Sequence, residues 1–213
     1  MQKLIGILGG TFDPVHYGHL KPALEIFQRL HLDELRVVPC FHPVHREPPV
    51  ATPEQRLRML QLALQEFPRF ILDDRELRRG GDSYMVDTLG ELRREFPQAV
   101  LCLLLGLDAL EGFKQWHRWQ QILKLAHLLV TVRPGYGLEP GSKRGKLIAQ
   151  YGMASAAGLH DRLAGGILLA ATAQYDISST LIRKRLRERQ SVDGLLPPAV
   201  GEWLSENRVY EVN

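Results

Sequence analysis

Short apolar runs alternate with segments of helical periodicity along most of this 213-residue chain. The first apolar run, Leu4 to Leu8, ends in Gly9 and Gly10, and His16 to Leu30 then carries apolar side chains at helical spacing. The most apolar run, Ala99 to Leu105, suits a strand that is covered on both faces. This alternation predicts an α/β fold of the Rossmann-like, doubly wound type, with a mostly parallel sheet and helices on both faces.

The remaining elements follow the same pattern. Strands are expected at Leu35 to Pro39, Phe70 to Asp73, His127 to Val132 and Ile167 to Ala170, and helices at Glu54 to Phe67, Ser83 to Phe96, Trp116 to Leu125, Lys143 to Tyr151, Ser178 to Glu188 and Pro198 to Ser205. The Gly- and Ala-rich stretch Gly152 to Gly166 is expected to be a surface loop with room for a short helix. In such a fold, ligands bind beyond the carboxyl ends of the central strands.

Length and composition favour a single globular domain over residues 1–213, with two small domains as the alternative that this length leaves open. Hydrophobic residues make up 45% and charged residues 24%, which is ordinary for a soluble folded protein. The formal net charge of +3 suits small anionic substrates, and the dense Lys and Arg stripe of a nucleic-acid-binding protein is not seen. The first residues resemble neither a signal peptide nor a membrane span, so no membrane partner is expected and the cytoplasm is the expected location. The oligomeric state is left open, homo-oligomers included.

Two glycines follow the first expected strand and precede a helix that starts near two histidines. Gly9 and Gly10 let the backbone approach a bulky anion, and the helix N-terminus offers N–H groups and a positive dipole. His16 and His19 are three residues apart, so they lie on one face and can point together at phosphates. The spacing is neither the G-x-G-x-x-G fingerprint nor a Walker loop. The alternatives are histidines that cap the helix or a chance metal pair, although no third ligand lies nearby.

A second cluster of polar residues opens the helix expected near the C-terminus. Ser178, Ser179 and Thr180 form a strong N-cap signal, and Arg183 follows one helical turn later. The N–H groups, hydroxyls and guanidinium of such a helix start suit phosphates, including a leaving pyrophosphate. The alternative is an ordinary capped helix, whose later arginines lie on a solvated face.

Together the two motifs resemble the signatures of the H-x-G-H nucleotidyltransferase superfamily. The chain reads Gly9-Gly10-Thr11-Phe12-Asp13-Pro14 and His16-Tyr17-Gly18-His19, and later Ile177-Ser178-Ser179-Thr180-Leu181-Ile182-Arg183. The resemblance implies that His16 and His19 hold the ATP phosphates and stabilise charge at the α-phosphorus. Arg183, with its expected contact to the leaving pyrophosphate, completes the expected catalytic set. The expected ATP site comprises Gly9, Gly10, Thr11, Phe12, Gly106, Asp108, Ile177, Ser178, Ser179 and Thr180.

Candidate metal ligands are few. Asp108 follows Gly106 at the end of the most apolar run and could bind ribose hydroxyls or a metal-bound water, with a turn carboxylate as the alternative. No set of carboxylates suggests an all-protein metal cage, so no metal is expected from the protein alone and Mg²⁺ is expected to arrive with ATP. Cys40 and Cys102 lie far apart in apolar surroundings, so both are expected to be buried thiols rather than a disulfide or a thiolate metal site.

The middle of the chain indicates the acceptor. Several segments there resemble bacterial nicotinate-nucleotide adenylyltransferase. They are Asp74 to Arg79, Ser83-Tyr84, Thr88-Leu89, Gly106-Leu107-Asp108, Trp116 and Arg133-Pro134-Gly135-Tyr136. This resemblance implies that ATP and nicotinate mononucleotide are the substrates, and that nicotinate adenine dinucleotide and pyrophosphate are formed in NAD biosynthesis. An adenylyltransferase for nicotinamide mononucleotide or pantetheine phosphate stays open, as does a non-catalytic nucleotide-binding regulator.

The expected acceptor site comprises Asp13, His45, Tyr84, Met85, Thr88, Trp116, His117 and Arg133. A pyridinium ring is flat and cationic, so Trp116 suits stacking and cation–π attraction with it. The alternative for Trp116 is core packing. Core packing is also the expected role of Trp119, which is expected to share a helical face with Trp116. By family analogy, the nicotinate carboxylate meets backbone amides near Met85 and His117.

Two further features of the expected acceptor site are its candidate phosphate contacts and a missing hydroxyl. His45 and Arg133 are candidate phosphate contacts. The alternative for His45 is a solvated loop histidine, and the alternative for Arg133 is a helix-capping or surface role. Where many related sequences read Ser-Tyr-Thr, this chain reads Ser83-Tyr84-Met85. A hydroxyl that could assist the acceptor is therefore absent, whereas the backbone amide is retained.

Overall fold

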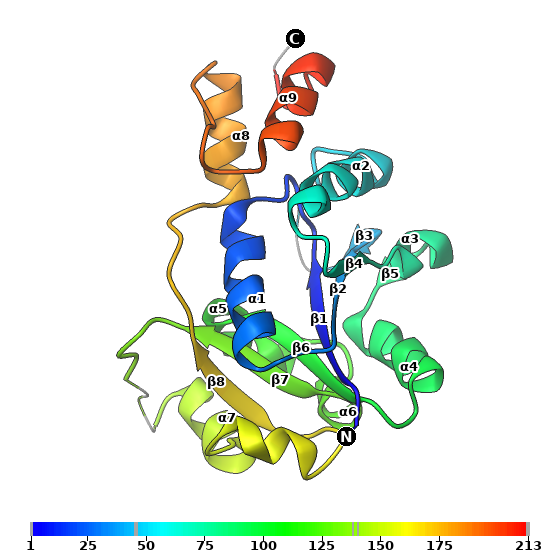
Figure 1. Ribbon diagram of the computed structural model, residues 1–213, viewed down its shortest axis with the longest axis vertical. Helices are drawn as coiled ribbons and strands as arrows, with labels where there is room; N and C mark the ends of the chain where they lie inside the picture. Colours follow the sequence, from blue (N-terminus) through cyan, green and yellow to red (C-terminus); the bar gives the residue numbers. More distant parts are fainter. Residues whose placement is uncertain (1, 45–46, 138, 140, 212–213) are drawn as a thin grey trace. The chain divides into compact units, whose positions relative to one another are not determined.

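The computed structural model describes residues 2–44, 47–137, 139 and 141–211. Its main sheet comprises β1 (Leu4–Gly10), β2 (Glu34–Pro39), β4 (Phe70–Leu72), β6 (Val100–Gly106), β7 (His127–Val132) and β8 (Ile167–Ala171). The strand order is β4-β2-β1-β6-β7-β8, and the pairs β1–β6, β6–β7 and β7–β8 are parallel (Figure 1). This is the order of a doubly wound sheet, so the expected Rossmann-like α/β fold is confirmed.

Helices connect these strands. The α-helices are α1 (Tyr17–Arg29), α2 (Pro53–Ala63), α3 (Arg75–Arg79), α4 (Met85–Glu95), α5 (Leu107–Glu111), α6 (Trp119–Leu125), α7 (Lys143–Tyr151), α8 (Ser179–Arg187) and α9 (Pro198–Asn207). Short 3-10 helices occur at η1 (Leu64–Glu66), η2 (Phe113–Gln115) and η3 (Ala156–His160), and β3 (His42–Pro43) pairs with β5 (Asp82–Ser83). The strands expected from the apolar runs are all present, and the short helix η3 lies inside the expected surface loop.

The structure differs from the sequence-based expectation at its shortest elements. The sequence does not predict α3 or α5, because five residues are too few to show helical periodicity. The predicted helix Trp116 to Leu125 is wrong at its start, since α6 begins at Trp119 after Arg118, whose φ is 50°. Trp116 has an extended backbone at the end of η2, so Trp116 and Trp119 do not share a helical face.

The chain divides into two compact units. Unit 1 comprises Met1–Gly9, Leu24–Arg36 and Tyr84–Ala173, and unit 2 comprises Gly10–Ala23, Val37–Ser83 and Gln174–Asn213. The expectation of a single domain over residues 1–213 stays a prediction. Among the residues that the structure describes, no helix is long and apolar enough to cross a membrane.

In unit 1 the parallel strands define the edge at which a ligand is expected. Strand β6 lies between β1 and β7, which accounts for its continuous burial from Val100 to Leu105. The register pairs Leu4 with Val100 and Ile7 with Leu103, so β1 and β6 run side by side in the same direction. Their carboxyl ends therefore reach one edge of the sheet, where the chain leaves the strands at glycines.

Two polar side chains, the half-buried Arg93 and the buried His127, hold the loops of unit 1. The Arg93 guanidinium donates to the carbonyl oxygens of Ala99 at 2.6 Å and Leu125 at 2.8 Å, which ties the ends of α4 and α6 together. His127 is fully buried, with its Nδ1 accepting from Gly166 N and its Nε2 lying 2.9 Å from the Arg162 carbonyl. This bonding pattern fixes a neutral imidazole, and burial lowers the pKa of His127.

In unit 2, helix α2 starts with strong sequence signals and packs on α9 (Figure 1). The Thr52 hydroxyl accepts from Gln55 N while the Gln55 side chain accepts from Thr52 N, and Pro53 occupies the first helical turn. The apolar faces of the two helices are buried, with Met59 and Leu60 on α2 and Val200 and Leu204 on α9. Helix α2 is thereby fixed at both its start and its buried face.

Candidate functional site

The loop after β1 in unit 2 explains the first glycine motif. Phe12 has a positive φ of 53° and is 2% exposed, so its ring folds back under the loop. A Cβ on Gly10 would lie 3.0 Å from that ring, which is closer than ordinary side-chain contacts. The second glycine of the motif therefore leaves room for Phe12, whose ring in turn packs edge-on against His19 at 5.2 Å.

The two motif histidines lie together, as expected from their spacing. The rings of His16 and His19 are stacked with centroids 3.7 Å apart. A Cβ on Gly18 would lie 2.9 Å from His16 Nδ1 and 3.0 Å from the carbonyl oxygen of Ile177. Glycine is required at this position because any side chain would collide with both the imidazole and the backbone of the second motif.

The second motif lies directly beside the first within unit 2. Ser178 caps α8 by accepting from Leu181 N at 3.1 Å, which confirms the predicted N-cap. The Ser179 hydroxyl donates to the Pro14 carbonyl at 2.9 Å, and the Arg183 Nη1 donates to the Asp13 carbonyl at 2.6 Å. The N-terminus of α8 and Arg183 are therefore held against the loop that carries the histidines.

This arrangement leaves buried nitrogen atoms available to a ligand. Among the described residues, His16 Nδ1 and Arg183 Nε are buried without a hydrogen-bond partner. The first N–H groups of α8 likewise lack partners inside their own helix. Buried nitrogen atoms without partners are costly, and here both belong to motifs that are hydrogen-bonded to each other, which indicates a site for an anionic ligand such as a phosphate.

Burial also sets the charge of His16. The side chain is 4% exposed, and desolvation lowers its pKa to about 4, so the imidazole is neutral at neutral pH. A neutral imidazole still donates one N–H to a phosphate oxygen. A bound polyphosphate would favour the protonated form and raise this pKa.

The free energy of unfolding is expected to fall as the pH is lowered from 6.5 towards 4. The folded state keeps His16 neutral in this window while the unfolded chain binds a proton, so acid favours unfolding. For His16 the shift corresponds to a loss of roughly 3 kcal/mol between pH 7 and pH 4. His127, whose pKa is also lowered by burial, contributes in the same direction.

Urea unfolding of wild type and His16→Gln at several pH values measures this effect. The variant should show a shallower pH dependence, because among the described histidines it leaves His127 as the one whose pKa is lowered by burial. In wild type, NMR titration of His16 should give a midpoint near 4 that rises when pyrophosphate is added. The same pH dependence in both proteins would contradict the buried, neutral state of His16.

Unit 1 carries the other residues expected to bind nucleotide. Asp108 is exposed in the first turn of α5, and its Oδ1 lies 2.5 Å from where a Cβ on Gly106 would be. The carboxylate therefore folds back over the glycine that ends β6. An exposed carboxylate at the carboxyl end of a central strand suits the expected contact with ribose hydroxyls.

Aromatic side chains gather in unit 1 around η2 and the start of α4. Tyr84 and His117 have ring centroids 4.3 Å apart, and the half-buried Trp116 packs on Phe113 at 5.6 Å. The ring centroid of Trp119 lies 5.9 Å from that of Phe113, and Trp119 is also half-buried. The two tryptophans therefore do not differ in how far they are packed into the core. Trp116 has a partly exposed face that can take a flat ring.

The other expected acceptor residues are less alike in their surroundings. Helix α4 begins at Met85 without a side-chain cap, and a Cβ on Gly9 would lie 2.4 Å from Met85 Cε. Thr88 is fully buried on α4, whereas Arg133 is exposed after β7. His45 lies outside the described residues.

Arg56 is a functional candidate that sequence reasoning missed. It is fully buried, and its guanidinium donates to four carbonyl oxygens, those of Ala51, Thr11, Cys40 and Phe41. The donor–acceptor distances are 3.3, 2.9, 2.6 and 3.0 Å, respectively. One signal was available, because Arg56 falls on the same helical stripe as the buried apolar residues of α2.

The described residues offer no protein-built metal site. No group of three or more His, Cys, Asp or Glu side chains among them is arranged to hold a metal ion. Both cysteines are free, but only Cys102 is buried as expected, whereas Cys40 is half-buried. Burial raises the pKa of both thiols, which disfavours thiolate ligands.

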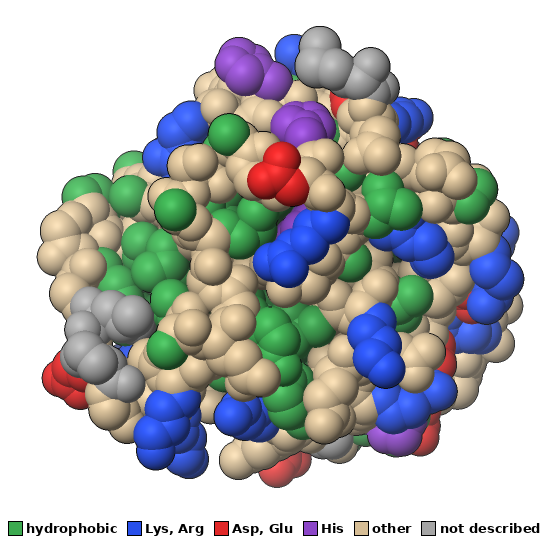
Figure 2. Space-filling model, turned by 90° about the horizontal axis from the view of Figure 1, so that it is seen from below, with side chains coloured by type: hydrophobic (Ala, Val, Ile, Leu, Met, Phe, Trp, Pro, Cys, Tyr) green, Lys and Arg blue, Asp and Glu red, His purple; other side chains and the backbone are tan. Residues whose placement is uncertain are grey.

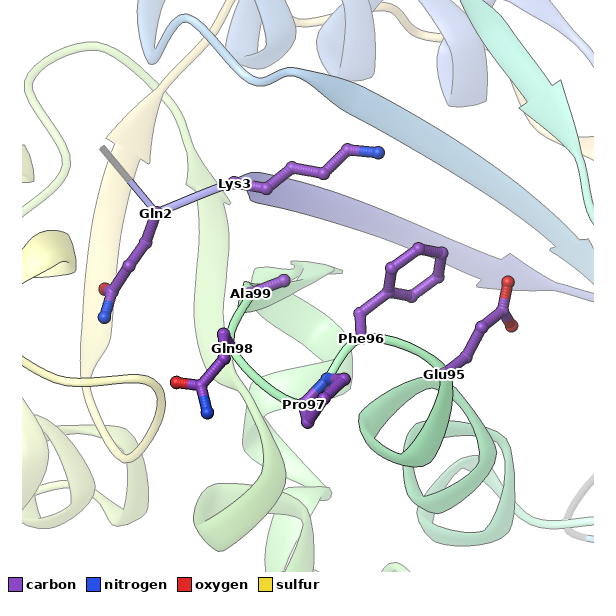
Figure 3. A pocket seen from close by; sticks show the side chains of 7 residues that line it. All are labelled: Gln2, Lys3, Glu95, Phe96, Pro97, Gln98 and Ala99. Carbon is purple, nitrogen blue, oxygen red and sulfur yellow. The ribbon is translucent and has the colours of Figure 1, made fainter.

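A hollow of about 690 Å³ lies elsewhere in unit 1 (Figure 3). Its lining residues precede β1 or run from the end of α4 to the start of β6, and they are Gln2, Lys3, Glu95, Phe96, Pro97, Gln98 and Ala99. It therefore lies at the amino ends of the two strands, opposite the edge where the glycines and Asp108 are found.

On the face shown in Figure 2, Lys and Arg side chains are interspersed with acidic and apolar ones.

The strand order and the glycine-ended strands define a doubly wound α/β protein of the nucleotide-binding class. Residues 7–185 match the family model described as cytidylyltransferase-like. A probable nicotinate-nucleotide adenylyltransferase from Methylococcus capsulatus is 47% identical, over 97% of this chain and 99% of the relative. A second, from Aeromonas salmonicida, is 43% identical over 100% of both chains. The chain belongs to the nicotinate-nucleotide adenylyltransferase family of cytidylyltransferase-like proteins.

Solved structures agree with the fold. A nicotinic acid mononucleotide adenylyltransferase from Plasmodium falciparum, complexed with NaAD, superposes with a TM-score of 0.75 at 17% identity, covering 100% of this chain and 99% of that one. Its complex with APC gives a TM-score of 0.72 with the same identity and coverage. At this identity the likeness supports the architecture alone.

Proposed function

We propose that this protein transfers the adenylyl group of ATP to nicotinate mononucleotide, forming nicotinate adenine dinucleotide and pyrophosphate in NAD biosynthesis. Relatives at 43–47% identity over nearly the whole chain are described as enzymes of this kind. An ATP-dependent enzyme of cofactor synthesis belongs in the cytoplasm, where ATP is made available. Nothing in this reaction requires a nucleic-acid or membrane partner.

One observation carries the proposal: the buried nitrogen atoms beside the N-terminus of α8. His16 Nδ1 and Arg183 Nε lack partners among the described residues, and the first motif is bonded to the second through Ser179. Triphosphate oxygens supply the acceptors that these donors need. His16 and His19 are assigned to the α-phosphate and Arg183 to the leaving pyrophosphate.

The reaction needs positioning and charge neutralisation more than proton transfer. The acceptor phosphate has a second pKa near 6, so it is largely a dianion at neutral pH and already a nucleophile. It attacks the α-phosphorus in line, the bond to the β-phosphate oxygen breaks, and pyrophosphate leaves with that electron pair. Neutral His16 and the adjacent His19 stabilise the charge that develops on the α-phosphate oxygens.

Magnesium fits this chemistry as a partner of ATP. A hard cation prefers oxygen ligands, and the triphosphate provides several close together. Asp108, which is exposed at the end of β6, is the side chain suited to a water-mediated contact with such an ion or to a ribose hydroxyl. When bound, the cation neutralises phosphate charge, while the remaining contacts come from the chain itself.

The acceptor is recognised by residues of unit 1. The uncapped start of α4 at Met85 provides N–H groups for the nicotinate carboxylate, and Trp116 stacks on the pyridine ring. An amide in place of the carboxylate would turn its NH₂ donors towards N–H donors. Since a buried polar group without its partner costs about 1–3 kcal/mol, kcat/KM should favour the acid by at least roughly tenfold.

A coupled pyrophosphate-release assay with nicotinate mononucleotide, nicotinamide mononucleotide and pantetheine phosphate tests this function. Trp116→Ala should lower kcat/KM for both pyridine nucleotides and preserve their ratio, because both acceptors share the stacked ring. Trp119→Ala is the matched control, since Trp119 also packs on Phe113. Equal use of the two pyridine nucleotides by the wild-type protein would overturn the acid-specific pocket, and preference for pantetheine phosphate would overturn the proposed acceptor.

A further inference from the structure

The carboxylate of Asp13 is a junction of four contacts within unit 2. Asp13 is 6% exposed. Its Oδ1 accepts from Ala51 N at 3.0 Å and from the Tyr210 hydroxyl at 2.7 Å. Its Oδ2 accepts from Val50 N at 2.9 Å and lies 3.5 Å from Arg183 Nη1. Both oxygens are thus occupied by the protein, which suits a positioning role better than direct contact with a substrate.

Arg183 is held by this same residue and still has a nitrogen to spare. Its Nη1 donates to the Asp13 carbonyl at 2.6 Å, and its Nη2 lies 3.4 Å from the Thr180 hydroxyl. Its Nε is buried and has no partner among the described residues. The direction in which Nε points therefore depends on how Asp13 holds the other side of the guanidinium.

Tyr210 reaches Asp13 from the far end of the chain. It follows α9, is 4% exposed, and its hydroxyl also lies 4.0 Å from Met59 Sδ on α2. The phenol stays protonated, because burial and the Asp13 charge both raise the pKa of Tyr210. The hydroxyl is thus a permanent donor that occupies one side of Asp13 Oδ1.

We propose that Tyr210 is a positioning residue for the phosphate site, acting through Asp13 on Arg183. By donating to Oδ1, the Tyr210 hydroxyl keeps the Asp13 carboxylate from turning to form a bidentate ion pair with Arg183. Loss of the hydroxyl leaves Oδ1 short of one donor. The Arg183 guanidinium already lies beside this carboxylate through Nη1 and still has an unpaired nitrogen, Nε, that can turn towards it. Arg183 is then drawn onto Asp13 and away from phosphate.

This inference rests on the proposed function for the role of Arg183 towards pyrophosphate, and the reverse reaction tests it. Tyr210→Phe keeps the buried ring and removes only the hydroxyl. We expect the KM for pyrophosphate to rise about tenfold, as for the loss of a charge-assisted hydrogen bond, with a much smaller change in the KM for nicotinate adenine dinucleotide. Val200→Ala is the matched control, because it loosens the same C-terminal segment on α9 and leaves the Tyr210 hydroxyl in place.

A double-mutant cycle separates positioning from general stability. In the Arg183→Ala background, Tyr210→Phe should no longer change the KM for pyrophosphate, because the residue it positions is absent. Calorimetric titration of pyrophosphate into the unliganded proteins provides a readout that does not depend on turnover. Weaker binding by Tyr210→Phe than by Val200→Ala at equal thermal stability supports the proposal.

The possible failures are distinguishable. If wild type makes ATP from nicotinate adenine dinucleotide and pyrophosphate, yet Tyr210→Phe behaves like Val200→Ala, the positioning role is overturned and the proposed function stands. If Tyr210→Phe and Arg183→Ala have additive effects, Tyr210 does not act through Arg183 and the proposal is also overturned. If wild type shows neither the reaction nor pyrophosphate binding, the proposed function itself fails.

Discussion

Replacing His19 with alanine is expected to lower kcat at least about a hundredfold while the fold stays intact. The His19 imidazole stacks on that of His16, with ring centroids 3.7 Å apart, beside the loop after β1. In the proposed reaction, negative charge develops here on the α-phosphate. Loss of one transition-state charge contact in a preorganised site costs roughly 3 kcal/mol, which corresponds to that factor. His19 is only half-buried, so its removal creates a smaller packing defect than the loss of a core residue would.

Steady-state kinetics with saturating ATP and nicotinate mononucleotide, together with thermal unfolding, measure this effect. His160→Ala is the control, because His160 is exposed at the end of η3 in unit 1. It should keep wild-type turnover and a wild-type melting temperature. Turnover of His19→Ala within a factor of about two of wild type would remove the H-x-G-H motif from the mechanism and with it the basis for assigning His16.

Several parts of the site were predictable from sequence because local chemistry determines them. The spacing of His16 and His19 places both on one face at a helix start, and the structure stacks their rings. The hydroxyl run at Ser178 predicted a capped helix, and the cap is present. The apolar run that became β6 predicted a strand covered on both sides. In each case the signal lies within a few neighbouring residues.

Other parts depend on contacts between distant segments, which no local pattern records. Tyr210 and Asp13 are separated by 197 positions, yet their side chains share a buried hydrogen bond. The collision that excludes a side chain at Gly18 involves the carbonyl of Ile177, which the sequence cannot place. Trp116 was misplaced on a helix because the left-handed backbone of Arg118 breaks a continuous apolar periodicity.

Arg56 is a case in which a local pattern correctly predicts burial and wrongly predicts an apolar residue. Its position on α2 matches the buried stripe, where an apolar residue would be the ordinary choice. The arginine suits this position because the loops after β1 and β2 and the segment before α2 bring carbonyl oxygens to the helix, and its guanidinium donates to them. The four acceptors come from Thr11, Cys40, Phe41 and Ala51, so one side chain joins three loop segments.

Arg56→Leu is therefore expected to lower the free energy of unfolding by at least about 3 kcal/mol, although leucine is apolar and helix-compatible. A carbonyl oxygen that is left buried without a donor costs about 1–3 kcal/mol, and leucine offers no hydrogen bond to any of the four. The contact with Ala51 is buried and the other three are part-buried. This is a large part of the roughly 5–15 kcal/mol that stabilises a typical domain. The result should be either a strongly shifted unfolding curve or a protein that does not fold.

Urea unfolding of Arg56→Leu beside Arg58→Leu checks this expectation on the same helix. Arg58 is exposed, so its replacement should change the free energy of unfolding by no more than about 0.5 kcal/mol. The comparison removes the effects of lost charge and of leucine in a helix, because both variants share them. Equal stability of the two variants would mean that the carbonyls around Arg56 find other partners, and that this guanidinium does not fix the loop before His16.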